Sequence, residues 1–512
     1  MAFTSSSRRL DRLVIVVAVV GLAILLAIPV FRAPPLVDDS FWIDYVWAGR
    51  FTAELRGGTI YPRWLSGSFD GLGAPVFYFY APLAFYGVAL AMLAGLATYP
   101  ALLATFVAFH AGSGLAMHIW LKTLDGQRWP ALAGALLYMA LPYHLIDFNR
   151  RGALAEFAAF AIIPLVAIGI RRALQGRGPL VLALSYAALV VTHLPTALLV
   201  SVLLIPPLAL RSGVVSRLWI VAVALLLGIG LAAIYLIPAL TLQDHSKIGL
   251  LWASYGFSPD VWNLLRPDRW PSASSGTVFG LVIVANAVTA ACLIRRRAWF
   301  WPVVAIVNCL VAGALIPGFW SLPLMAKVQF PWRALSIVEF AVATALAEYL
   351  ATTAHKGWRL LGLVPALCIS LSIVALPFPV GHPTLQELDR ERPDVPEYLP
   401  VTGPIRTSKE AVALARAMPD GYLQNGVTIR RRFWFPNVEV RCAGRVVTSF
   451  PDPATGRVAY RGTPDCRITT VPTRAERFGL IVSLLAAGLV ALLLLRTALL
   501  GRPARPGLAS LQ

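Results

Sequence analysis

Hydrophobic runs of membrane-spanning length alternate with short polar segments along almost the whole chain. A run of about 20 apolar residues crosses a bilayer as a helix, because a backbone in lipid must satisfy its own hydrogen bonds. We therefore expect a mainly α-helical, polytopic membrane protein with about 12 to 14 spans. The twelve clearest runs are 13–31, 101–121, 130–145, 156–170, 179–193, 195–210, 218–238, 277–294, 299–316, 334–354, 359–378 and 478–495.

Basic residues gather in alternate loops between these runs. Short loops rich in Lys and Arg stay in the cytoplasm, so the alternation predicts that both chain ends lie on the cytoplasmic side of a bacterial inner membrane. The apolar run 76–97 would break the alternation if it crossed the membrane. We interpret it as a juxtamembrane or re-entrant segment, or as half of a pair whose partner the pattern hides. The basic loops lie at 8–12, 122–128, 171–177, 211–217, 295–297, 356–359 and 496–505.

The composition agrees with this pattern and excludes two classes of protein. Hydrophobic residues make up 58% of the 512 residues and charged residues 13%, unlike the composition of a water-soluble globular protein. The net charge of +19 would suggest a nucleic-acid partner in a soluble protein. Here the basic loops hold 18 of the 44 Lys and Arg, and the other 26 nearly balance the 23 acidic residues outside these loops. The charge therefore reflects topology, and we expect no nucleic-acid partner.

Four segments on the outer side are long enough to carry a function: 32–75, 239–276, 317–333 and 379–477. The last contains a helical stretch, 408–418, capped by Ser408 and ended by Pro419. Alternating runs then predict five short β-strands, at 426–435, 437–442, 445–450, 456–462 and 466–471. We therefore expect a multi-span membrane domain over 1–378, a periplasmic β-rich domain over 379–477, and a last span with a cytoplasmic tail over 478–512.

The five cysteines divide between these regions. Cys292, Cys309 and Cys368 lie in predicted spans, where a thiol acts as a small apolar group. Cys442 and Cys466 lie at the ends of predicted strands in the outer domain. Because an oxidising compartment favours disulfides, we expect these two to pair.

The most informative polar residues follow the first span. Asp38 and Asp39 come directly after it, and Asp44 lies one helical turn further, within an amphipathic stretch from Ser40 to Leu55 that suits a helix lying along the membrane surface. A carboxylate at this place can take a proton from an acceptor hydroxyl, or can help to hold a divalent cation such as Mg²⁺ or Mn²⁺ on a phosphate. The alternative is a solvated pair that only ends the first span.

Several motifs resemble known families. An acidic pair after the first span resembles the signature of the GT-C membrane glycosyltransferases. The segments GGTIYPRW, GLGAPVFYFYAPL, LIDFNRRGALAEFAAFAIIPL and QFPWRAL resemble a group of bacterial polytopic proteins labelled 6-pyruvoyl-tetrahydropterin-synthase-related, as does the tail from RRFWFPNVEV onwards. The pterin chemistry in that label requires a three-His zinc site, whereas the seven His here are scattered. The resemblance instead implies a GT-C-like fold and sugar transfer on the outer face from a lipid-phosphate-linked donor.

A donor phosphate requires cations, and basic residues at the outer boundaries run against the usual bias. An outer Arg can also contact lipid headgroups or pair with Asp147, Glu156 or Asp268. Glu156 and Glu339 lie just inside spans, where Arg150, Arg151 and Arg333 are their candidate partners. His193, at an outer helix end, can donate to phosphate or sugar, or only to helix carbonyls. The candidate substrate-binding residues are Asp44, Arg63, Arg150, Arg151, Glu156, His193, Arg266, Arg269 and Arg333.

The sequence therefore favours a membrane glycosyltransferase that moves a sugar from a polyprenyl-phosphate-linked donor to a lipid, polysaccharide or protein acceptor of the envelope. Asp39 or Asp38 would be its catalytic base, and the same pair would hold a metal if one is used. Two alternatives stay open. One is a transporter or flippase of lipid-linked sugar, although no inverted repeat is evident. The other is a non-catalytic factor that uses the outer domain for envelope assembly.

Overall fold

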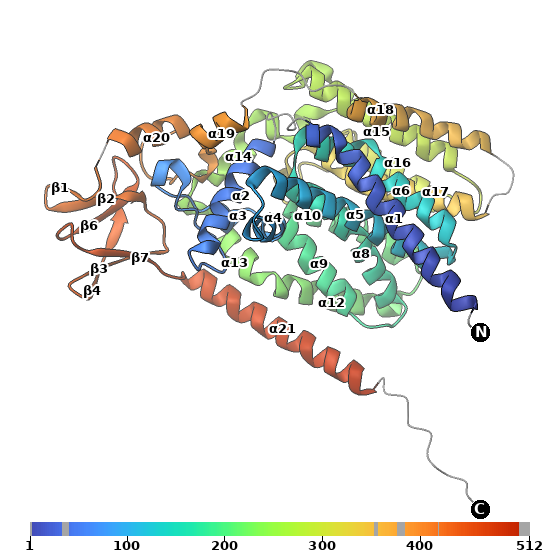
Figure 1. Cartoon of the computed structure of the whole chain (residues 1–512), viewed down its shortest axis with the longest axis horizontal. Helices are drawn as coiled ribbons and strands as arrows, with labels where there is room; N and C mark the ends of the chain where they lie inside the picture. Colours follow the sequence, from blue (N-terminus) through green and yellow to red (C-terminus); the bar gives the residue numbers. More distant parts are fainter. Residues whose placement is uncertain (1–2, 33–39, 353–356, 376–383, 418, 501–512) are drawn as a thin grey trace, which may run out of the picture.

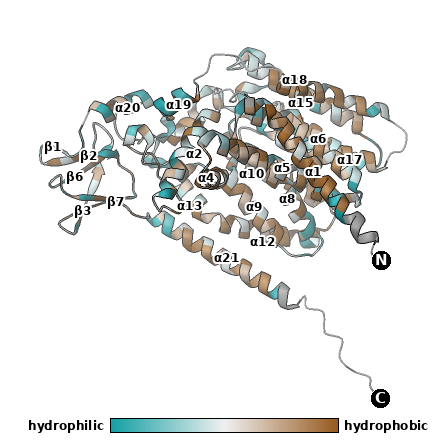
Figure 2. Cartoon of the chain, in the orientation of Figure 1, coloured by the Kyte–Doolittle hydropathy of each residue, from teal (hydrophilic) through white to brown (hydrophobic). Residues whose placement is uncertain are grey.

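The computed structural model describes residues 3–32, 40–352, 357–375, 384–417 and 419–500. A helical bundle forms most of the molecule, a β-rich part lies at one end of it, and helix α21 runs along one flank (Figure 1). Figure 2 shows that the bundle and α21 are predominantly hydrophobic, whereas the β-rich end is more hydrophilic. The longer helices up to residue 375 are α1 (Phe3–Arg32), α2 (Phe41–Arg56), α4 (Leu83–Leu93), α5 (Thr98–Asp125), α6 (Arg128–Ala140), α8 (Leu154–Leu174), α9 (Leu180–Thr192), α10 (Leu194–Leu203), α12 (Leu218–Leu231), α13 (Ala233–Thr241), α15 (Ala273–Leu293), α16 (Phe300–Ala312), α17 (Leu335–Thr352) and α18 (Val364–Ala375).

The number of helices that can cross a membrane is lower than the sequence predicts. All twelve hydrophobic runs become helical, but within the described residues eight segments are long and apolar enough to cross, or up to ten if two bent pairs each count as one span. Helices α9 and α16 have 13 residues each. A 13-residue helix is about 20 Å long, against a hydrocarbon layer of about 30 Å. Hydropathy alone overestimates the count because an apolar run can extend past the end of its helix.

The run 76–97 does not form one long helix. It divides into α3 (Val76–Phe79) and the eleven-residue α4, with Pro82 immediately before α4. Eleven residues rise about 16 Å, roughly half of the hydrocarbon thickness. The segment is therefore too short to cross a membrane as a helix, in keeping with our interpretation of it as non-spanning.

One bent pair shows how a proline break is stabilised inside the bundle. Helix α6 ends at Ala140, and the chain from Pro142 to Arg151, which begins with α7 (Pro142–Ile146), continues at an angle of 45°. Pro142 has no N–H that could donate to the carbonyl of Tyr138. The ring nitrogen Nδ1 of His144 lies 3.0 Å from this carbonyl and replaces the missing donor. The carbonyl of Met139 is likewise contacted by His110 Nε2 at 3.0 Å. The two histidines thus satisfy carbonyls that the break leaves without a helical donor.

Glu339 of α17 completes this break. Its carboxylate accepts the backbone N–H groups of Tyr143 and His144, at 2.6 and 3.0 Å. These amides are free because they open the new helix α7, whose positive end favours an anion. The predicted pairing of Glu339 with an arginine is therefore wrong, since helix-end amides hold this carboxylate.

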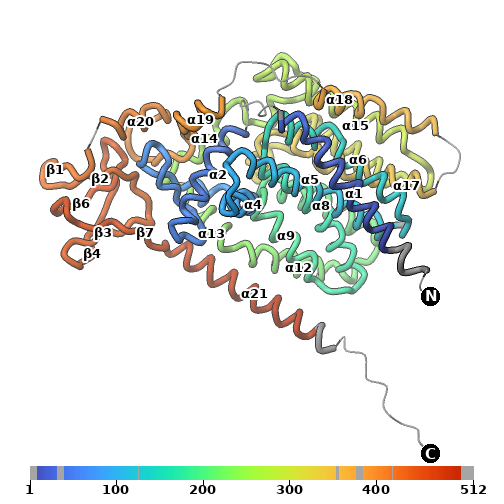
Figure 3. Tube along the Cα trace, in the orientation of Figure 1, coloured from blue at the N-terminus to red at the C-terminus, as the bar shows by residue number. Residues whose placement is uncertain are grey.

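The two ends of the bundle differ in character. Helix α1 begins, and α21 (Arg474–Leu500) ends, at the end opposite the β-strands (Figures 1 and 3). Arginines of the basic loops pair with acidic residues of α1 and α17. Arg128 pairs with Asp11, and Arg211 Nη2 lies 3.1 Å from Glu348. Arg295 donates to Thr352 at 2.5 Å. Arg128, Arg211 and Arg295 therefore lie near the start of α1 or the end of α17.

The β-rich part holds two antiparallel sheets. One has four strands in the order β1-β2-β6-β5, and the other has three in the order β4-β3-β7. The five predicted strands become seven, because β1 was not anticipated and 445–450 divides: β4 pairs with β3, whereas β5 pairs with β6. The strands are β1 (Tyr422–Gln424), β2 (Val427–Phe433), β3 (Val438–Cys442), β4 (Arg445–Val447), β5 (Ser449–Pro451), β6 (Arg457–Arg461) and β7 (Arg467–Thr470).

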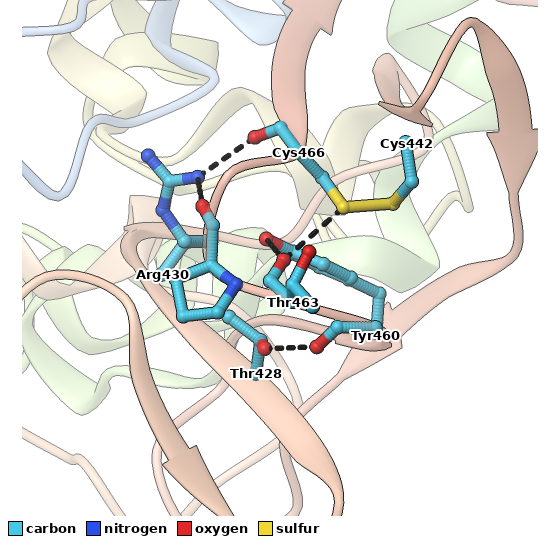
Figure 4. The surroundings of a disulfide bond; sticks show 8 residues. Thr428, Arg430, Cys442, Tyr460, Thr463 and Cys466 are labelled. Carbon is cyan, nitrogen blue, oxygen red and sulfur yellow. Dashed lines mark hydrogen bonds between the residues drawn. A yellow bond between two sulfur atoms is a disulfide. The ribbon is translucent and has the colours of Figure 1, made fainter.

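A disulfide joins Cys442, at the end of β3, to Cys466, just before β7 (Figure 4). Arg430 of β2 donates to the carbonyl of Cys466 at 3.0 Å and also pairs with Asp420. The disulfide therefore cross-links β3 to the start of β7 within the smaller sheet, and Arg430 connects the larger sheet to this point. Cys466 itself is almost fully buried.

Two helices precede the strands. Helix α19 (Leu385–Glu391), which the sequence pattern did not reveal, starts with a capping box of Thr384 and Glu387. The predicted helix appears as α20 (Ser408–Ala417). Its capping oxygen belongs to Thr407, which accepts from the amide of Glu410 at 3.2 Å, whereas the Ser408 hydroxyl donates to Asp394. The predicted cap is therefore displaced by one residue.

The β-rich part packs closely on α2 and on the segment between α2 and α3. Phe433 donates its backbone N–H to the carbonyl of Leu72, at 2.8 Å. Asp394 accepts from the amide of Phe69 and forms an ion pair with Arg50 at 2.5 Å. Burial raises the pKa of Asp394 even though Arg50 stands beside it. One hydrophobic core contains residues from both sides of the predicted boundary near residue 378, from Phe41 to Phe435. The two predicted domains therefore share this core.

Candidate functional site

Helix α2 brings the residues after the acidic pair into the bundle. It packs against α4, α5 and α19, and eight of its sixteen residues are buried. The predicted surface-lying amphipathic helix is therefore enclosed by protein on several sides. Asp44, which is 1% exposed, accepts the backbone N–H of Leu154 at 3.0 Å, at the start of α8. Asp38 and Asp39 themselves lie outside the described residues.

A buried ion cluster lies at the start of α8. Glu156 Oε2 is 3.0 Å from Arg151 Nη1 and 3.2 Å from Arg333 Nε. Arg151 Nη1 also contacts Asp147 at 2.6 Å, and the Tyr143 hydroxyl donates to Glu156 at 2.5 Å. We call Tyr143, Asp147, Arg151, Glu156 and Arg333 the ion cluster; all five are at most 8% exposed.

Local backbone geometry places Arg151 and Glu156 together. A π-helical turn, Asp147–Arg151, follows α7, and Gly152 then adopts a left-handed conformation with φ 58° before α8 begins. A Cβ at Gly152 would lie 2.6 Å from the Cβ of Phe41, so glycine is needed both for the turn and for the approach of α2. The tight turn lets two oppositely charged residues five positions apart meet.

Arg333 reaches the cluster from a distant part of the chain. It lies in a short 3₁₀ turn, η10 (Pro331–Ala334), that precedes α17. The neighbouring Trp332 stacks on Phe279 with ring centroids 4.1 Å apart and on Phe330 at 4.7 Å. Arg333 Nη1 donates to Val328 and Gln329, which leaves Nη2 without a hydrogen-bond partner among the described residues.

The chain before α2 is attached to this cluster. Ser40, which follows Asp39 in the sequence, donates its backbone N–H to the carbonyl of Arg151 at 3.2 Å. The residue next to the acidic pair is therefore fixed on the turn that carries Arg151.

His193 also belongs to this neighbourhood. It is buried at the break between α9 and α10, and its Nδ1 lies 2.7 Å from Thr196 Oγ1. It is within electrostatic range of Glu156, Arg333 and Arg151. Tyr80, which no sequence pattern singled out, is within the same range of Asp44, Arg333 and Glu156.

The other predicted arginines do not join the cluster. Arg150 is half-buried and donates to the carbonyl of Ile373 in α18 at 3.2 Å, because adjacent residues on a helical turn point in different directions. Arg266 and Arg269 are exposed in the turn η8 (Pro267–Arg269), where Arg266 lies 3.4 Å from Asp268. Arg150, Arg266 and Arg269 therefore lie outside the ion cluster, and their part in substrate binding stays a prediction.

Arg63 lies elsewhere as well. Its guanidinium is 3.8 Å above the ring of Tyr61, 3.6 Å from Glu476 at the start of α21, and 2.6 Å from the carbonyl of Ile234. It lines a groove of about 450 Å³ between the segment after α2, the β-strands and α21. Arg63 and Arg333 thus belong to two different sites.

The residues that sequence reasoning missed have weak local signals. Tyr143 directly follows the proline of the helix break, and nothing in the hydropathy pattern marks its hydroxyl as a partner of Glu156. Asp147, by contrast, is among the partners that the sequence offers for an outer arginine, and it stands four residues before Arg151. Among the described residues, no three His, Cys, Asp or Glu side chains are grouped to hold a metal ion. The sequence candidates for that role, Asp38 and Asp39, lie outside this part.

Comparisons with known proteins were made on both sequence and structure. No curated protein matches the sequence. Two cryo-EM structures of the arabinofuranosyltransferase AftD from Mycobacteria, one of a mutant, resemble this fold with TM-scores of 0.45 and 0.44 and 14% identity. The likeness covers 71% and 70% of this chain and 26% and 27% of AftD, so the chain spans about a quarter of that protein's length.

A family model matches residues 77–378, which include the ion cluster, α3, α4 and the helices from α5 to α18. The matched part covers more than half of the chain. It also contains the Pro142 break and the π-helical turn on which the cluster depends. The protein therefore belongs to the membrane proteins that carry a 6-pyruvoyl-tetrahydropterin synthase related domain.

Proposed function

We propose that the protein is a GT-C-type membrane glycosyltransferase that moves a sugar from a polyprenyl-phosphate-linked donor to an envelope acceptor. The observation that carries the proposal is the junction of the ion cluster with the chain that follows the acidic pair. Ser40 is bonded to the Arg151 carbonyl, and Arg151 and Arg333 converge on Glu156 beside it. Cations for a phosphate and carboxylates for a proton transfer thus come from three separate segments.

The cluster suits a lipid phosphate because its cations are already held in place. Arg151 is balanced by Asp147 and Glu156, and Arg333 is anchored by Glu156 and backbone. The two N–H groups of Arg333 Nη2 can donate to a phosphate oxygen, a charge-assisted bond of about 1.5–3 kcal/mol. The donor site therefore needs little rearrangement of Arg333 when the phosphate binds.

The proposed catalytic base is Asp39, with Asp38 as its neighbour. Glu156 already accepts from two arginines and a tyrosine, and so serves as the counter-ion that orients them. A base must take the proton of the acceptor hydroxyl as that oxygen attacks the anomeric carbon of the donor sugar. The bond between this carbon and the lipid phosphate breaks in the same step, and polyprenyl phosphate leaves. If a divalent cation takes part, the acidic pair would hold it against the donor phosphate.

The test compares transfer with transport in one preparation. The protein is reconstituted in vesicles with a fluorescent polyprenyl-phosphate sugar, and sugar transfer and lipid movement between leaflets are measured in parallel. We expect transfer to an added envelope extract without faster lipid movement. Faster movement without transfer would favour a flippase, and neither activity together with binding of envelope polymer would favour an assembly factor. Either result would contradict the proposal.

A further inference from the structure

The groove that contains Arg63 has the size and chemistry of a ligand site separate from the ion cluster. Its volume of about 450 Å³ lies within the range of small-molecule sites. Three segments form it: the chain between α2 and α3, strand β2 with the loop after β7, and the first turn of α21. Its walls carry Glu54, Arg63, Arg432 and Glu476. We call it the polar groove.

Arg432 supplies a positive charge in the polar groove that forms no direct ion pair among the described residues, although Glu54 lies within electrostatic range. Its guanidinium donates to Thr470 at 3.0 Å and to Asn437 at 3.2 Å, and it lies 4.7 Å from the ring of Trp64. No carboxylate lies within salt-bridge distance of it among the described residues. Burial lowers the pKa of Arg432 to about 10. A guanidinium held only by neutral groups has capacity for an anion from outside.

The two carboxylates of the polar groove are fixed by protein donors. Glu54 Oε1 accepts from the Ser66 amide at 2.8 Å, and Glu476 Oε2 accepts from the Thr473 amide at 2.7 Å. Glu476 also lies beside Arg63. Carboxylate oxygens that are held in place, each with further lone pairs, can accept hydrogen bonds from the hydroxyls of a ligand. The groove therefore offers one site for an anion and two for hydroxyl groups.

The polar groove is close to the ion cluster along the chain. Tyr78 lines the groove, and Tyr80, two residues on, is within electrostatic range of Arg333 and Glu156. Two residues span about 7 Å at most. The Tyr61 hydroxyl donates to the carbonyl of Phe77, and the Tyr235 hydroxyl donates to that of Phe79, so the strip between the two sites is held on both sides.

We propose that the polar groove binds an acidic saccharide, with the carboxylate or phosphate of the sugar on Arg432 and ring hydroxyls on Glu54 and Glu476. The identification of this saccharide as part of the acceptor rests on the proposed function. Binding itself is independent of transfer and can be measured without a donor.

The experiment uses the full chain in nanodiscs and calorimetric titration with four probes: glucuronic acid, glucose 1-phosphate, glucose and inorganic phosphate. Both acidic sugars should bind at least about tenfold more tightly than glucose, because a charge-assisted hydrogen bond is lost with the neutral sugar. Arg432→Gln should remove that preference. Arg467→Gln, at an exposed position on β7, is the matched control and should behave as wild type.

A second variant keeps the proposal testable if Arg432→Gln fails to fold. Glu54→Gln retains an oxygen for Ser66 but removes a negative charge near Arg432, so it should raise the preference for the acidic sugars over glucose several-fold. Equal affinities of wild type and Arg432→Gln, or inorganic phosphate binding as tightly as glucose 1-phosphate, would overturn the proposal. Lost transfer with intact saccharide binding would count only against the proposed function.

Discussion

Glu156 shows at the scale of one residue how this site balances buried charge. Two guanidinium groups and a phenol converge on it, and Asp147 supplies the second carboxylate that Arg151 requires. Removing one partner of a buried pair leaves the other charge uncompensated, at a cost of about 3–5 kcal/mol. Substitutions that keep shape but change charge are therefore the informative ones here.

Arg333→Gln should weaken binding of the polyprenyl-phosphate sugar by roughly tenfold to a hundredfold, because the donor phosphate loses a charge-assisted hydrogen bond. Arg63→Gln should leave donor affinity nearly unchanged, since Arg63 lies in the polar groove. Fluorescence titration of the purified variants with labelled donor measures both. Equal losses in the two variants would place both arginines at one donor site, contrary to the structure.

Asp39→Asn should slow transfer about 10²–10⁴-fold while donor binding and protein level stay near wild type. Asn keeps the size and the capping oxygen of Asp, so a purely structural role survives the change. Asp38→Asn is the matched control and should be milder, because adjacent side chains cannot point the same way. Wild-type transfer rates in both variants, measured with saturating donor, would show that the pair only ends the first span.

At the scale of elements, the helix break at Pro142 shapes the site. The break ends α6, α7 turns by 45°, and the π-helical turn then presents Asp147 and Arg151 to α8. Imidazole nitrogens and Glu339 satisfy the backbone groups that the break exposes. The geometry of the ion cluster therefore depends on the hydrogen bonds of the helix break, one of which joins the amide of Tyr143, a member of the cluster, to Glu339.

His110→Leu should lower the melting temperature, because the carbonyl of Met139 loses its partner in a buried place, at a cost of about 1–3 kcal/mol. His110→Gln retains a side-chain N–H and should recover part of the loss. Thermal unfolding of the detergent-solubilised protein, followed by intrinsic fluorescence, provides the measurement. Similar melting temperatures for the Leu and Gln variants would mean that volume, and not hydrogen bonding, is what His110 contributes.

Gly152→Ala should destabilise the protein more than Gly126→Ala does. Both glycines have positive φ, 58° and 73°, but only at Gly152 would a new Cβ meet another atom within 4 Å. The left-handed conformation alone costs about 1–2 kcal/mol, and the clash with Phe41 adds to it. Melting temperatures of the two variants make the comparison. A smaller loss at Gly152 would show that α2 moves away easily.

For the molecule as a whole, the β-rich part packs directly against α2 and the segment between α2 and α3. Phe433 is bonded to Leu72, Asp394 to Arg50, and Arg431 contacts Asp70. The polar groove exists only because these segments meet. The groove and the ion cluster also lie near one another, because Tyr78 lines the groove and Tyr80 is within electrostatic range of Arg333 and Glu156.

This arrangement leads to a prediction about topology. After mild reduction of intact spheroplasts, an impermeant thiol reagent should label Cys442 and Cys466, while a cysteine placed at Arg296 should be labelled only after lysis. Labelling of the Cys442→Ser, Cys466→Ser double variant measures the background signal from Cys292, Cys309 and Cys368. Mass spectrometry of the labelled peptides identifies the sites. Labelling of the β-rich part only after lysis would reverse the proposed orientation.

The sequence alone predicted the helical membrane class, a β-rich region near the C-terminus and the cysteine pair. It also named Arg150, Arg151 and Arg333 as candidate partners of Glu156, a set that contains the two observed ones. These follow from hydrophobic runs and from the rule that a buried charge requires a partner, which need little knowledge of distant contacts. Only the tertiary structure decided that Arg63 lies in the polar groove, that Arg150 turns toward α18, and that amides hold Glu339. The direction of a side chain on a turn, and the place where two segments far apart in the chain meet, depend on packing that no local pattern records.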